Sequence, residues 1–76
     1  MLVLMDYKTE FAAKLRELRE VAGVSIREAA SRVTANKFAC SKTTWMRWEN
    51  GENSPPVEAL PAIAAAFGKK ITNLLP

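Results

Sequence analysis

Residues 41–51 read SKTTWMRWENG, and this stretch has the pattern of a short helix with one buried and one exposed face. Trp45 and Trp48 lie three residues apart and therefore share a helix face, where paired tryptophans are more often core residues than ligand platforms. The stretch begins with a serine, which is a good N-cap, and ends with a glycine, which is common just after a helix. It therefore predicts a helix over residues 42–50 whose indole side is buried.

Two helices are predicted before this stretch. Apolar residues recur four, three and four positions apart over residues 7–22, which places one apolar stripe on a helix that ends at a glycine. Residues 25–28, SIRE, form a capping box that begins a second helix. Residues 34–40, TANKFAC, break the pattern of this second helix, so we expect an extended turn there with Phe38 packed inward.

Two helices are also predicted after it. Residues 52–56, ENSPP, are strong turn formers. A helix from about Val57 follows, with Pro61 in its first turn, where a missing N–H group has little effect. A short fifth helix is expected at residues 71–75. The predicted fold is all-α, a compact five-helix single domain over residues 1–76 with an extended turn between helices 2 and 3.

Composition narrows the function classes. With 76 residues, of which 49% are hydrophobic, the chain has room for one modest core, and its net charge of +3 agrees with a nucleic-acid partner. The single Cys40 excludes an internal disulfide and fits a reducing cytoplasm, and with one cysteine and no histidine we expect no zinc site. No nucleophile–base set or phosphate-binding glycine loop is evident, so we expect neither an enzyme nor a cofactor.

The apolar residues 1–5, MLVLM, are too few for a signal peptide or a membrane span. Residues 1–6 are therefore read either as a loose start of the chain or as an arm that contacts the partner in a dimer. No predicted helix pairs a basic face with a large apolar one, so membrane binding is not expected.

Several motifs together resemble the lambda-repressor/Cro-like helix-turn-helix family. They are SIREAA at 25–30, SKTTWMRWENG at 41–51, AAAFG at 64–68, and Leu18-Arg19 shortly before Gly23. The resemblance covers about residues 11–75, and the WENG tetrad is close to the family's usual end of the recognition helix. It implies a five-helix DNA-binding domain.

The resemblance assigns candidate DNA contacts. A helix-turn-helix lays its second helix in the major groove with the N-terminal residues at base edges. The expected base contacts are Lys42, Thr43, Met46 and Arg47. The expected backbone contacts are Arg19, Lys37, Ser41, Thr44, Asn50, Gly51 and Asn53. The alternative is that these side chains form an ordinary solvated helix face.

The family also implies a structural ion pair between Arg19 and Glu49, with Arg19 additionally offering its guanidinium to a phosphate. Cys40, just before the recognition helix, is read as a small, partly buried residue, with a thiol sensor as the alternative.

Three features depart from the family pattern. The turn between helices 2 and 3 is about five residues longer than usual, which shifts the expected angle of the recognition helix. Ile26 stands where the family often has a DNA-contacting glutamine. Glu52 stands in a turn that normally faces phosphate, where its charge should weaken binding.

These observations predict a transcriptional regulator, most simply a repressor that binds an inverted repeat of double-stranded DNA as a homodimer, with half-sites about 34 Å apart. The expected dimer interface is Ile71, Leu74 and Leu75. Because the sequence ends at Pro76, we expect no separate ligand or dimerisation domain, and the small format favours a phage or another mobile element. The alternatives are an antitoxin or accessory regulator whose main partner is a protein, and a helical interaction module without DNA binding.

Overall fold

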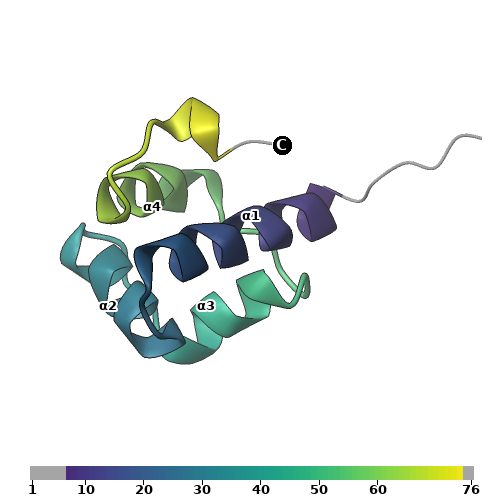
Figure 1. Ribbon diagram of the computed structural model, residues 1–76, viewed down its shortest axis with the longest axis horizontal. Helices are drawn as coiled ribbons and strands as arrows, with labels where there is room; N and C mark the ends of the chain where they lie inside the picture. Colours follow the sequence, from purple (N-terminus) through teal and green to yellow (C-terminus); the bar gives the residue numbers. More distant parts are fainter. Residues whose placement is uncertain (1–6, 75–76) are drawn as a thin grey trace, which may run out of the picture.

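The computed structural model describes residues 7–74, which form α-helices and short 3-10 turns without a β-strand in that range (Figure 1). The elements in order are α1 (Tyr7–Ala22), α2 (Ile26–Ala35), α3 (Lys42–Glu49), η1 (Val57–Ala59), α4 (Leu60–Ala66) and η2 (Ile71–Asn73). Helix α3 packs against both α1 and α2, and α4 packs against α2. The predicted all-α class is confirmed, and the proposed arm at residues 1–6 lies outside the described residues.

One hydrophobic core joins all four helices. Phe11 and Leu15 of α1, Val33 of α2, Trp45 of α3 and Ile63 of α4 are all fully buried in it. The stripe predicted for α1 is therefore the face that packs inward, although Ala22 at its end is exposed. Because every helix contributes to the same core, the position of α3 depends on the three other helices.

Aromatic contacts hold α3 on its buried side. The ring centroid of Trp45 lies 6.0 Å from that of Trp48 and 5.8 Å from that of Phe67, at the end of α4. Phe38, in the turn before α3, lies 6.2 Å from Trp48 and is half-buried, as its predicted anchoring role requires. Both tryptophans are core residues, which confirms the interpretation of their spacing.

The turn between α2 and α3 is shorter than predicted. Helix α2 continues through Thr34 to Ala35, and the hydroxyl of Thr34 then fastens the turn to the helix. Its Oγ1 donates to the carbonyl oxygen of Cys40 at 2.9 Å and accepts from the N–H of Cys40 at 3.0 Å. Within this turn, Lys37 has a φ of 76°, which is rare for a residue with a Cβ.

The two helices predicted at the C-terminal end are both altered. The expected helix from Val57 begins as η1 because Pro61 has no N–H to give the carbonyl of Val57, which accepts from Leu60 instead. The expected fifth helix is a single 3-10 turn over Ile71–Asn73. An isolated segment this short gains too few hydrogen bonds to offset helix nucleation.

Candidate nucleic-acid interface

The four predicted base contacts lie on one exposed face of α3. Lys42, Thr43, Met46 and Arg47 are all exposed, whereas Trp45 and Trp48 on the opposite side are buried. The exposed side chain of Lys42 at the start of α3 can donate hydrogen bonds, and Met46 offers an apolar surface between the polar side chains. This face therefore has the composition that base edges in a major groove require.

The N-terminus of α3 is capped as predicted. The side chain of Ser41 accepts from the N–H of Thr44 at 3.1 Å, and the hydroxyl oxygens of the two residues lie 3.0 Å apart. Ser41 is exposed and Thr44 is half-buried. These hydroxyls therefore hold the first turn of α3 in place, and the phosphate contacts expected of them stay predictions.

The turn after α3 offers fewer donors than expected. The backbone N–H groups of Asn50 and Gly51 donate to Met46 and Trp48 carbonyls at 2.9 and 3.2 Å, and that of Asn53 points to Arg47 at 3.4 Å. Gly51 therefore has no free donor for the predicted phosphate contact. Asn50 and Asn53 retain exposed side chains, although the Asn50 amide lies 3.4 Å from the carboxylate of Glu52.

The predicted ion pair between Arg19 and Glu49 is present. Arg19 Nε donates to one oxygen of Glu49 at 2.6 Å, and Nη2 donates to the other at 3.2 Å. The third nitrogen, Nη1, donates to the carbonyl of Val24 at 3.3 Å. All three nitrogens of Arg19 thus have a partner within the protein, which gives Arg19 a positioning role, and its additional phosphate contact stays a prediction.

Two further partners of Glu49 were not predicted from the sequence. The indole N–H of Trp45 donates to Glu49 Oε2, and Arg16 Nε lies 3.5 Å from Oε1. The spacings carried a signal, because Trp45 and Glu49 are four residues apart on α3 and Arg16 and Arg19 are three apart on α1. The spacing did not predict that both arginines contact the same carboxylate.

The electrostatics of Glu49 follow from these contacts. Burial by itself favours the neutral acid, but hydrogen bonds from Arg19 and Trp45 and the positive charge of both arginines outweigh it, so the pKa of Glu49 is lowered. The same hydrogen bond raises the pKa of Arg19. Glu49 is therefore ionised at neutral pH and fixes α1 against the end of α3.

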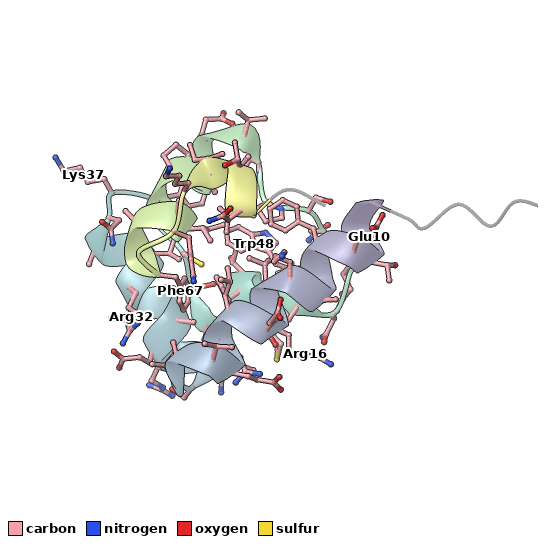
Figure 2. The ribbon with its side chains drawn as sticks, turned by 45° about the horizontal axis from the view of Figure 1, so that its top comes forward. Glu10, Arg16, Arg32, Lys37, Trp48 and Phe67 are labelled. Carbon is pink, nitrogen blue, oxygen red and sulfur yellow. The ribbon has the colours of Figure 1, made fainter. Side chains whose placement is uncertain are left out.

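The residues of the α2–α3 turn have different surroundings. Lys37 is exposed and extends away from the body of the protein (Figure 2). Cys40 is buried, and this burial raises the pKa of its thiol. A buried thiol with a raised pKa is a poor nucleophile, which favours the structural interpretation of Cys40 over the thiol sensor.

The predicted dimer interface is only partly available. Leu74 is fully buried in the core of its own chain, so its assignment to an interface is corrected. Ile71 is exposed, and Leu75 lies outside the described residues. Val21 of α1 is more exposed than Ile71 and lines a cavity of about 450 Å³ together with Phe67 and Asn73.

Helix α3 follows α2 in the chain, packs against it and exposes its other face to solvent, which is the arrangement of helix-turn-helix proteins. Residues 10–70 match the family described as the helix-turn-helix domain, and the chain belongs to this family. The match agrees with the resemblance to lambda-repressor/Cro-like proteins. Neither a curated protein nor a solved structure matches the chain.

Two properties of residues 7–74 complete the description. None of their helices is long and apolar enough to cross a membrane. Their one cysteine and their acidic side chains nowhere gather in a group of three that could hold a metal ion.

Proposed function

We propose that this protein is a sequence-specific DNA-binding regulator whose helix α3 enters the major groove. The observation that carries the proposal is the exposed face of α3, where Lys42 and Arg47 flank Thr43 and Met46 while the opposite face is locked into the core. Lysine and arginine donate to guanine acceptors, and threonine and methionine suit the thymine methyl group. A rigidly held helix with these side chains is suited to reading a sequence.

Contacts to the DNA backbone would add affinity without sequence preference. We propose this role for five side chains around α3 that are exposed or half-buried. They are Lys37, Ser41, Thr44, Asn50 and Asn53. The family assignment supports binding to double-stranded DNA, and we infer that the protein acts in the cytoplasm by occupying its site rather than by catalysis.

We further propose that the protein represses transcription as a homodimer on an inverted repeat. One domain of this size reads few base pairs, and symmetric doubling raises both affinity and specificity. The exposed apolar side chains of Val21 and Ile71 support a contact between copies.

Selection from random DNA duplexes tests the proposal. The expected result is enrichment of an inverted repeat whose half-sites are about 34 Å apart. Lys42→Ala and Arg47→Ala should each relax the preference at one position per half-site. Lys14→Ala, which removes one charge from α1 on the side away from α3, is the matched control and should leave the motif unchanged. Failure to enrich any motif at low salt would refute sequence-specific binding.

A second candidate function is that of an antitoxin or accessory regulator with a protein as its main partner. The cavity beside Val21 favours it, because that cavity lies between α1 and the C-terminal segment, where a partner would not cover α3. Co-expression with neighbouring gene products followed by purification under native conditions would test it. A stable complex with a second protein, together with no enriched motif in the DNA selection, would favour this function over the first.

A further inference from the structure

Two arginines of α1 share a single carboxylate of α3. Arg19 makes the closer contacts with Glu49, at 2.6 and 3.2 Å, and the Nε atom of Arg16 lies 3.5 Å from the same carboxylate. One negative charge balances only one of the two guanidinium groups. Glu20 on α1 also acts electrostatically on Arg19, but at the junction itself Glu49 is the carboxylate in ion-pair contact with both guanidinium groups.

Of the two arginines, Arg16 lies at the surface of the junction. The exposed fraction of the side chain is 3% for Glu49, 19% for Arg19 and 52% for Arg16. Figure 2 shows Arg16 pointing outward from α1. Arg19 is therefore the internal partner of Glu49, and Arg16 is the cation that meets solvent.

Arg16 also borders the exposed face of α3. Glu49 follows Met46 by three residues and precedes Asn50 by one, so it forms the edge of the face on which Met46 and Asn50 are exposed. A side chain that contacts Glu49 from α1 lies along that edge. Arg16 is thus placed beside the surface that we propose to enter the groove.

The donors of Arg16 suit a second anion. A guanidinium carries five N–H donors, and the contact with Glu49 uses Nε, which leaves the four on Nη1 and Nη2. These two nitrogens form the planar fork that binds phosphate in a bidentate manner. The neighbouring backbone N–H groups of Asn50 and Gly51 are already bonded within the protein, so a phosphate at this edge needs a side-chain donor.

We propose that Arg16 binds a DNA backbone phosphate at the junction of α1 and α3, in the role that the sequence had suggested for Arg19. The inference rests on the proposed DNA binding. In this arrangement Glu49 orients Arg16, and the phosphate is a second anion for the Arg16 guanidinium group. The contact carries no sequence information and positions α3 in the groove.

The salt dependence of DNA binding tests this proposal. Affinities of the wild type and Arg16→Ala for the selected duplex are measured between 50 and 200 mM salt. Each protomer of the proposed dimer loses one phosphate contact, so the slope of log affinity against log salt should fall by about 1.8 for the two copies together, and the ratio of the two affinities should shrink about 12-fold over this range. The selected motif should stay the same.

Lys14→Ala is the matched control, because Lys14 also lies on α1 but lines the cavity on the flank away from α3. It should leave the slope unchanged. Arg16→Lys keeps the charge without the fork, and we expect it to retain the slope with lower affinity. Thermal melts of each variant verify that it is folded.

An unchanged slope for Arg16→Ala, or a change equal to that of Lys14→Ala, would overturn the assignment to Arg16 while leaving sequence-specific binding intact. A slope lowered by Arg19→Gln but not by Arg16→Ala would return the contact to Arg19. If the folded wild type binds no duplex at any salt concentration, the proposed function itself fails and this contact fails with it.

Discussion

At the scale of single residues, Glu49 is the feature on which the site depends. Among the side chains that the structure describes, residues 9–74, it is the only charged one that is buried, and its carboxylate receives hydrogen bonds from Arg19 and Trp45. A buried charge is tolerated only when its partners replace the water that it loses. The interaction is therefore better understood as fixing the geometry of α1 and α3 than as a large net source of stability.

Removing one partner of this pair should be strongly destabilising. We expect Glu49→Ala and Arg19→Ala each to lower the free energy of unfolding by about 3 kcal/mol, because each leaves the other charge without a partner. In a double-mutant cycle measured by urea unfolding, the coupling between them should be about 1–3 kcal/mol. Additive effects of the two substitutions would show that the pair is energetically independent.

The same carboxylate predicts a pH dependence of stability. Since the pKa of Glu49 is lower in the folded protein than the value of about 4.3 in an unfolded chain, the unfolded state binds the proton more tightly. The stability that ionised Glu49 contributes is therefore fully present above pH 4.3 and is lost as the pH falls through the lower pKa of the folded state.

Urea unfolding of the wild type and Glu49→Gln at pH 7 and at pH 3 measures this contribution. The difference in stability between the two proteins should be smaller at pH 3, because glutamine cannot ionise. An equal difference at both pH values would mean that Glu49 titrates alike in the folded and unfolded chains.

At the scale of elements, the hydroxyl of Thr34 determines where α2 ends and how the chain returns to α3. Its two hydrogen bonds with Cys40 close the turn, and Ser41 then caps α3 directly. Lys37 belongs to this turn, between Thr34 and Cys40, and its side chain is exposed. The start of the proposed recognition helix is thus positioned by a polar contact with the helix before it.

Thr34→Val should test this connection because it keeps the shape and removes the hydroxyl. It leaves the N–H and carbonyl of the buried Cys40 without their partner, so we expect a loss of about 1–3 kcal/mol in the free energy of unfolding. Thr34→Ser retains the hydroxyl and should lose less. Thermal and urea unfolding measure both, and a loss for Thr34→Val no larger than that for Thr34→Ser would show that the hydroxyl contributes no more than the methyl group.

At the scale of the whole molecule, the C-terminal segment has one apolar residue in the core and another at the surface. Leu74 is buried in the core that joins the four helices. Ile71, three residues earlier, is exposed to solvent, and Asn73 of the same segment lines the cavity beside Val21. Stability and self-association are therefore separable by substitution.

Sedimentation and unfolding experiments should separate them. Leu74→Ala should lower the free energy of unfolding by about 2–5 kcal/mol, as expected for a large-to-small change in a core. Ile71→Glu should leave the stability of the monomer nearly unchanged and weaken the proposed dimer. A dimer that survives both Ile71→Glu and Val21→Glu would place the interface elsewhere on the molecule.

Local chemistry in the sequence determined most of the helices and the composition of the proposed reading face. The apolar spacing of α1 and the caps at Ser25 and Ser41 are local signals, because they involve neighbours along one helix. The spacing of Trp45 and Trp48 likewise separated the buried face of α3 from the exposed one. These features could be predicted because the backbone geometry of a helix alone relates the residues.

The tertiary structure decided the features that depend on residues far apart in the chain. Arg16 and Arg19 are both 30 or more positions from Glu49, so only packing revealed that Arg19 is enclosed and Arg16 exposed. The burial of Leu74 likewise depends on the other helices, and the length of the α2–α3 turn depends on a hydroxyl that reaches across six residues. The physical reason is that burial and the pairing of charges belong to the assembled core, whereas helix patterns and caps belong to single segments.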